Sequence, residues 1–292
     1  MEEPGAQREN WRDTEMAFSV VTNIGALNAQ NQLTKTERSL QTTINRLSSG
    51  LRINGAKDDA AGLAIAENLH ADIQGLNQAV RNANDGISVI NCADAGLQEI
   101  GNLLHRAMTL AEQAASDTSG GDNTTSKISI NSEYTQILQE IDRIAGTVQF
   151  NGLALLSGAG ASLDVQIGLG SGTNDRIHIS TSGVTASGLG LTQDALTAKI
   201  TARDELVQIQ SAVDTVSRNR GDLGAYYNRL EHTIAVISTQ SENLSAAESQ
   251  IRDANTAEEI VNLTKYQVLN QTGLAALSQA NSTSQSVLSL LK

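Results

Sequence analysis

The stretch LSSGLRINGAKDDAAGLAIAENL, residues 47–69, opens a helical pattern that continues to Ala114 and decides the fold of this 292-residue chain. From Ala66 onward, apolar residues recur at alternating steps of three and four, with one extra three-residue step to Ala93. A stripe kept over so many turns is typical of a long helix that packs lengthwise against other long helices. Its members are Ala66, Leu69, Ile73, Leu76, Val80, Ala83, Ile87, Ile90, Ala93, Leu97, Ile100, Leu104, Ala107, Ala111 and Ala114.

A second stripe of the same period runs from about Thr201 to Ala254 and predicts the long helix against which the first one packs. Thr201, followed three residues later by Asp204, predicts a capped start for this helix. Between the two stripes, residues 127–148 predict a third helix, which folds back antiparallel after the Gly/Ser/Thr-rich turn at residues 116–126. The second stripe is formed by Leu206, Ile209, Val213, Val216, Leu223, Tyr227, Leu230, Ile234, Ile237, Leu244, Ala247, Ile251 and Ala254, interrupted by Arg220 and Ser241.

The period changes in the middle of the chain, where Leu163, Val165 and Ile167 alternate with polar residues, as do Ile177 and Ile179. A turn-like segment separates the two runs, so we predict one small β-hairpin at about residues 163–180. The predicted fold is therefore mainly α, with a long antiparallel helical bundle over residues 62–252 that carries this hairpin.

The two ends of the chain carry weaker helical patterns, over residues 16–49 and 253–292. We expect them to pair as a separate inner coiled coil, which is the simplest way for either end to hide its apolar stripe. The first segment is basic and the second begins in an acidic stretch, which favours the pairing slightly. Both have few large apolar groups, so we expect them to become ordered only when neighbours cover them. The apolar positions are Val20, Ile24, Leu27, Leu33, Leu40, Ile44 and Leu47 in the first segment, and Leu277, Ala280, Val287 and Leu291, with Ser284, in the second.

Residues 1–15 differ from the rest because they are charge-dense and hold the only Trp and Pro. We interpret them as a disordered leader or a misassigned start, with Met16 as the true first residue.

Composition excludes several classes of protein. The net charge is -12, aromatic residues are 2%, and no basic patch with interleaved aromatics is present, which argues against a nucleic-acid partner. No apolar run is long enough to span a membrane, and no secretory signal is visible at the N-terminus. Cys92 is the only cysteine, so no intrachain disulfide can form, and a small packed thiol is expected there.

No residue pattern predicts a catalytic site, a cofactor or a metal. The four histidines, His70, His105, His178 and His232, lack ligand spacing. Four glycines within the first stripe, Gly75, Gly86, Gly96 and Gly101, are unusual because each costs a helix about 1 kcal/mol relative to alanine. Either a neighbouring helix or subunit approaches closely there, or a long helix simply tolerates them.

Short motifs spread over nearly the whole chain after Met16 resemble those of bacterial flagellins. In the first half they are TNIGALNAQ at 22–30, LSSGLRINGAKDDAAG at 47–62, RNANDGIS at 81–88 and EIDRIAGTVQFNGL at 140–153. In the second half they are GDLGAYYNR at 221–229, residues 251–259, and VLSLLK at 287–292.

The resemblance implies a non-enzymatic structural subunit that polymerises into the flagellar filament for swimming motility. The terminal helices would form an inner tube, the bundle an outer wall, and residues 50–61 the spoke between them. The candidate polymerisation segments are then Ala17 to Leu47 and Asp253 to Lys292. The chain would be a short form without large outer domains. It would be secreted by flagellar type III export and located in the extracellular filament.

The implied partners are further copies of the chain, an export chaperone that binds the C-terminal segment, and hook-associated and cap proteins. The resemblance also gives three positions that match contacts with Toll-like receptor 5: Arg106, Leu110 and Glu133. Their surroundings depart from the recognised pattern at Met108, Thr109 and Glu112, so we expect weak or absent recognition. The alternatives are a hook-filament junction protein, a non-polymerising coiled-coil adaptor and, less compatible with the short middle, a flagellin with an inserted metallopeptidase.

Overall fold

The computed structural model describes residues 22–116 and 125–290, with the side chains of 287–290 left out. It divides into two compact units, Met1–Ala66 with Glu248–Lys292 and a second one of Glu67–Ala247. The predicted leader at 1–15 lies outside the described residues, as do Val20, Leu291, the side chain of Val287 and most of the predicted turn at 116–126.

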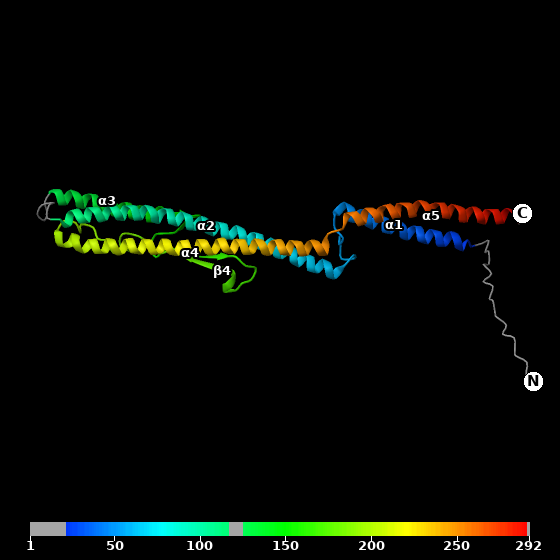
Figure 1. The fold of residues 1–292 in the computed structure, drawn as a ribbon, viewed down its shortest axis with the longest axis horizontal. Helices are drawn as coiled ribbons and strands as arrows, with labels where there is room; N and C mark the ends of the chain where they lie inside the picture. The colour runs from blue at the N-terminus through cyan, green and yellow to red at the C-terminus, as the bar shows by residue number, and fades with distance from the viewer. Residues whose placement is uncertain (1–21, 117–124, 291–292) are drawn as a thin grey trace, which may run out of the picture. The chain divides into compact units, whose positions relative to one another are not determined.

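The second unit is a bundle built mainly from three helices, α2 (Ala60–Ala115), α3 (Thr125–Thr147) and α4 (Lys199–Arg252). Figure 1 shows α2 running antiparallel to both α3 and α4. All members of the predicted α2 stripe are buried or half-buried, and a continuous aliphatic core joins the three helices. The predicted mainly α bundle is confirmed.

The start of α4 differs from the prediction. The helix begins at Lys199, and the hydroxyl of Thr201 donates to the carbonyl oxygen of Ala198 at 2.9 Å. The predicted cap at Thr201 is wrong because a threonine hydroxyl can turn back to the preceding backbone instead of accepting from the turn ahead. Farther along α4, the polar interruption Arg220 donates through Nε to Asp94 of α2 at 2.7 Å.

The predicted hairpin is confirmed, because β3 (Ser162–Gln166) pairs antiparallel with β4 (Arg176–Ser180). The paired residues run from Ser162 opposite Ser180 to Gln166 opposite Arg176. A short 3-10 helix, η2 (Thr173–Asp175), lies in the connection. A second hairpin, which was not predicted, joins β1 (Gln149–Phe150) to β2 (Leu153–Ala154). Its turn is Asn151–Gly152, both at positive φ, as the tight hairpin turns favoured by an Asn-Gly pair require.

Three of the four α2 glycines lie where another segment approaches the helix. A Cβ at Gly96 would stand 2.7 Å and 2.8 Å from its nearest neighbours, whereas nothing lies within 4 Å of one at Gly101. Close approach therefore explains Gly75, Gly86 and Gly96, and tolerance explains Gly101. The side chains that a Cβ would meet are Leu169 at Gly75, Val165 and Leu230 at Gly86, and Val148 and Leu156 at Gly96. All but Leu230 come from residues 148–180, which carry the two hairpins and which we call the β region.

Hydrogen bonds to the buried Glu205 of α4 hold the segment that returns from β4 to α4. The Tyr134 hydroxyl of α3 donates to Glu205 of α4 at 2.5 Å. Both the backbone N–H and the hydroxyl of Thr192 donate to the same carboxylate at 2.9 Å. Burial, followed by the hydrogen bond to Glu205 and by the charge of that carboxylate, raises the pKa of Tyr134 well above its usual range. Glu205 therefore joins both Thr192 of the return segment and Tyr134 of α3 to α4.

The first unit pairs α1 (Ile24–Ser49) with α5 (Thr256–Leu290), as predicted. The two helices run antiparallel and side by side (Figure 1). Asn23 caps α1 by accepting from the Ala26 N–H at 3.0 Å, and Gly50 ends the helix at φ 73. The following segment is bonded to the end of α4: the Ala254 N–H donates to the Gly50 carbonyl at 2.9 Å.

Candidate functional site

The α1–α5 pair has an unusually polar seam. The most buried side chains of α1 are Thr36 and Thr43, 7% and 4% exposed. By contrast Ile24, Leu27 and Ile44 remain 58%, 52% and 41% exposed. The expectation that pairing hides the α1 stripe is therefore wrong for these three residues. Ile24 and Leu27 lie on a different helical face from the less exposed residues, and Ile44 lies at the edge of that less exposed face, so one partner helix does not cover all three. The less exposed residues are Ala26, Ala29, Leu33, Thr36, Leu40, Thr43 and Leu47.

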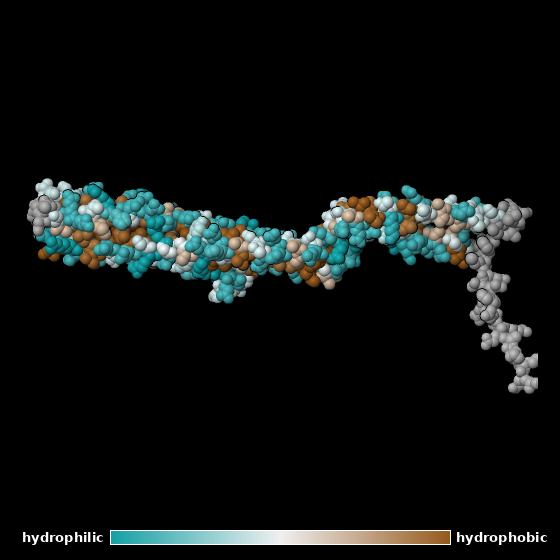
Figure 2. Space-filling model, viewed as in Figure 1, coloured by the Kyte–Doolittle hydropathy of each residue, from teal (hydrophilic) through white to brown (hydrophobic). Residues whose placement is uncertain are grey.

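Helix α5 also turns apolar side chains to solvent. Val261 is 66% exposed, and Ile260, Val268, Leu269 and Leu274 are each 43% to 53% exposed. Hydrophobic residues are visible along this helix in Figure 2. The exposed residues between 260 and 269 line a depression of about 460 Å³. We call the surface formed by Ile260, Val261, Thr264, Lys265, Val268 and Leu269 the α5 face.

Polar contacts tie α1 to α5 near both ends of α1. Arg46 pairs with Glu259 at 3.3 Å, with side chains 32% and 10% exposed, and the Asn23 side chain donates to the Ala280 carbonyl at 3.0 Å. A partly solvated ion pair contributes roughly 0–1 kcal/mol. A weakly joined pair with exposed apolar faces is suited to being covered by further chains.

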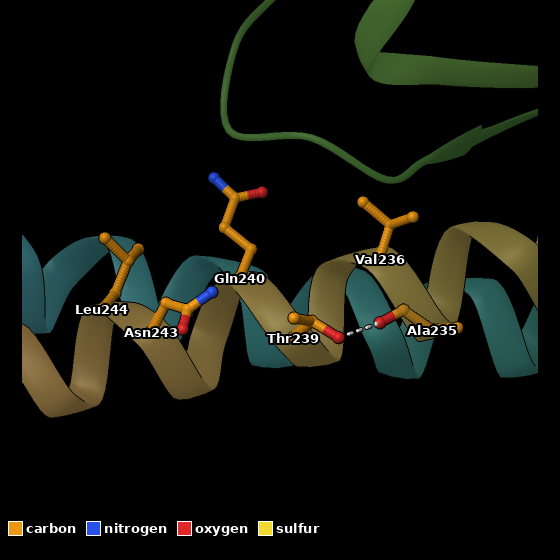
Figure 3. A pocket seen from close by; sticks show the side chains of 6 residues that line it. All are labelled: Ala235, Val236, Thr239, Gln240, Asn243 and Leu244. Atoms are coloured by element: carbon orange, nitrogen blue, oxygen red, sulfur yellow. Dashed lines mark hydrogen bonds between the residues drawn. The ribbon is translucent and has the colours of Figure 1, made fainter.

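A second apolar surface lies on α4, in the other unit. Figure 3 shows the side chains of Val236, Gln240 and Leu244 projecting from the helix. Val236 is 66% exposed, and the Thr239 hydroxyl donates to the Ala235 carbonyl at 3.0 Å, which satisfies that polar group within the helix. With Asn243, these residues line a shallow pocket of about 460 Å³, which we call the α4 face.

The three positions matched to receptor contacts do not form one surface. Arg106 and Glu133 are brought together across α2 and α3, with Nη2 2.6 Å from Oε1 and side chains 56% and 46% exposed. Leu110 is only 3% exposed and belongs to the bundle core.

The β3–β4 hairpin places Ser162, His178 and Asp164 in the order of a hydrolase relay, which sequence spacing did not reveal. His178 Nδ1 is 2.8 Å from Asp164 and Nε2 is 3.4 Å from the Ser162 hydroxyl. However, the His178 and Asp164 side chains are 59% and 50% exposed, and Asp164 also faces Arg176 at 3.6 Å. Water therefore competes for each contact, and the nucleophile lacks the enclosed setting that activates a serine.

Within the described residues, no group of three or more His, Cys, Asp or Glu side chains could hold a metal ion. Among the same residues, no helix is long and apolar enough to cross a membrane. Cys92 is half-buried, with its sulfur 3.8 Å from the Gln149 carbonyl oxygen.

Comparison with known families decides what the helices belong to. The bacterial flagellin N-terminal helical region matches residues 20–161, and the bacterial flagellin C-terminal helical region matches residues 206–291. The chain belongs to the flagellin family. This flagellin is 40% identical to flagellin FlaB2 of Treponema pallidum, over 92% of this chain and 98% of that one. It is 37% identical to the flagellin of Bacillus subtilis, with the same shares covered.

A crystal structure of Bacillus cereus flagellin is also similar, with a TM-score of 0.45 and 30% identity over 57% of this chain and 94% of that one. Family membership identifies the chain as a structural subunit of the flagellar filament rather than an enzyme. The comparisons give no support to a hook-filament junction protein or a non-polymerising adaptor.

Proposed function

We propose that this flagellin polymerises through its terminal segments, Ala17 to Leu47 and Asp253 to Lys292. The observation that carries the proposal is the α5 face, where aliphatic side chains remain 43% to 66% exposed although α1 already lies against the helix. Fully burying one such side chain contributes about 1.5–3 kcal/mol. Several of them, covered by neighbouring copies, would supply a large share of the free energy of elongation.

Two valines of nearly equal exposure give a matched test. Val261 of the α5 face is 66% exposed and Val207 of α4 is 65% exposed. Asparagine has nearly the helix propensity of valine, so either Val→Asn change leaves the isolated helix almost unaffected. We expect Val261→Asn to stop or greatly slow elongation from filament seeds and Val207→Asn to slow it much less. Equal elongation rates for the two variants would contradict the assignment of assembly to the terminal segments.

We further propose that the chain is secreted unfolded by flagellar type III export, guided by a chaperone on residues 253–292. The single cysteine supports this route, because a chain that can form no intrachain disulfide can be exported without reducing one. Truncation before residue 253 should abolish both secretion and chaperone co-purification; normal secretion of the truncated chain would refute the proposal. Hook-associated and cap proteins are the proposed partners at the filament ends, and filament growth in strains lacking each of them tests this.

Recognition by Toll-like receptor 5 is proposed to be weak or absent. Met108, Thr109 and Glu112 depart from the recognised pattern, and Leu110 is buried in the bundle rather than available at its surface. Purified monomer should give little activation in a cell reporter assay. Strong activation would overturn this expectation.

A further inference from the structure

A polar pocket lies between the end of the β3–β4 hairpin and α4, within the second unit. Its volume is about 350 Å³. The hairpin side provides Arg176 and the η2 residues Thr173 and Asn174, and α4 provides Arg229 and His232. The pocket therefore collects two guanidinium groups and an imidazole in a chain whose net charge is -12.

The spacing along α4 explains why its two basic groups share the pocket. Arg229, His232 and Thr233 stand at i, i+3 and i+4, which places them on one helical face. The intervening acid, Glu231, is two residues from Arg229 and so points to another side of the helix. The carboxylate closest to Arg229 in sequence is therefore not directed at the pocket.

The positive charge of the pocket is incompletely matched within the described residues. The guanidinium group of Arg176 donates to the Ser171 carbonyl at 3.0 Å and lies 3.6 Å from the Asp164 carboxylate, so part of this group already has partners. The Arg229 guanidinium has neither a hydrogen bond nor an ion pair among the residues that the structure describes. Asp175, the other acid near the hairpin end, accepts from the Gly172 N–H at 3.2 Å instead of lining the pocket.

Part of the pocket lining is apolar. Ile177, 3% exposed, and the half-buried Ile167 form this apolar wall. A low-dielectric wall strengthens the attraction between the guanidinium groups and an anion, compared with an arginine surrounded by water. Planar guanidinium groups match the two oxygens of a carboxylate or phosphate, and a neutral imidazole can add one N–H donor.

We propose that this pocket is an oxyanion-binding site, which takes a carboxylate or phosphate group against Arg229 and Arg176. The site goes beyond assembly through the terminal helices, because it lies on the bundle. Two sources could supply the group: a free anion, or an acidic side chain of a second copy, and the second source rests on the proposed polymerisation.

The first measurement is the binding of inorganic phosphate to full-length monomer, by phosphorus NMR line broadening at constant ionic strength. Arg229→Gln should weaken binding about tenfold or more, since it removes a charge-assisted pair of hydrogen bonds. Arg218→Gln is the matched control: it makes the same charge change on α4, and Arg218 does not line the pocket. The control should remain within about twofold of wild type. Arg229→Lys, which keeps the charge but not the planar guanidinium group with its paired N–H donors, should bind phosphate with intermediate affinity.

The second measurement separates the two sources. If an acidic side chain of a second copy occupies the pocket, phosphate slows seeded elongation of wild type more than chloride of equal ionic strength, and Arg229→Gln loses this difference. If a free anion is the ligand, phosphate binds but does not slow elongation selectively. The proposal is overturned if wild-type monomer binds phosphate no better than Arg229→Gln monomer and the Arg229→Gln variant keeps the helicity of wild type. If neither wild type nor any variant elongates, that result counts against the proposed polymerisation instead. The phosphate-binding measurement then tests the oxyanion-binding site by itself.

Discussion

Replacing Gly96 and Gly101 separately by alanine tests whether the β region packs closely against the surface of α2. Both changes gain about 1 kcal/mol of helix propensity. At Gly101 nothing opposes this gain, because no atom lies within 4 Å of the new Cβ. At Gly96 the Cβ would stand 2.7 Å from Val148 Cγ2 and 2.8 Å from Leu156 Cδ1, and Leu156 is fully buried. Overpacking of this kind costs about 1–3 kcal/mol.

The propensity gain is common to both variants, so the difference between them isolates the steric cost of about 1–3 kcal/mol. For a unit of this size, each kcal/mol moves the melting temperature by about 2–4 °C. Gly101→Ala should therefore melt above wild type, and Gly96→Ala about 2–12 °C below Gly101→Ala, in the main unfolding transition followed by circular dichroism at 222 nm. If Gly96→Ala melts at or above Gly101→Ala, close packing of the β region on α2 is not what excludes a side chain there.

Three further outcomes are expected. The pKa of Tyr134 is raised in the folded state, so above about pH 10 its hydroxyl loses a proton in the unfolded chain but keeps it in the folded one. The contribution of Tyr134 to the free energy of unfolding should therefore fall by about 1.4 kcal/mol per pH unit above about pH 10. Tyr134→Phe should remove this part of the fall in denaturant titrations at pH 9 to 11, and an unchanged slope would exclude Tyr134 as its source. Asn151→Ala, at φ 50, should cost about 1–2 kcal/mol of unfolding free energy whereas Asn151→Gly should not, and equal losses would mean that the left-handed backbone is not the cause. In the monomer, amide hydrogens of residues 24–49 and 256–290 should exchange much faster than those of residues 89–111; uniform protection would contradict a marginal terminal pair.

The long helices could be predicted because their evidence is local and repeated. Each turn of α2 from Ala66 to Ala114 restates the same period, so one polar substitution would not hide it. The β1–β2 hairpin escaped because its strands have two residues each, too few for alternation to show, although its Asn151–Gly152 turn was a usable signal. The contact of Tyr134 with Glu205 spans 71 positions, and no spacing within either helix indicates it.

The faces of the terminal helices were predicted less well, for a different reason. An apolar stripe considers only apolar residues, and in α1 it joined Leu33 and Leu40 to Ile24, which lies on another face. The seam also includes Thr36 and Thr43, which an apolar pattern passes over. The oxyanion pocket was equally hidden, because Arg176 and Arg229 come from elements far apart in the sequence.

Under the proposed polymerisation, the polar seam links the order of the terminal helices to assembly. Fixing the backbone of one residue costs about 1–2 kcal/mol, and threonines at a helix contact return little of this through apolar burial. The aliphatic side chains that could return more, such as Val261 and Val268, lie outside the seam, where the proposed polymerisation would cover them with another chain. An aliphatic seam would stabilise the pair without copies, yet it would leave fewer apolar groups for subunit contacts. The bundle of residues 67–247 does not share this dependence, because its buried core already joins α2, α3 and α4 within one chain.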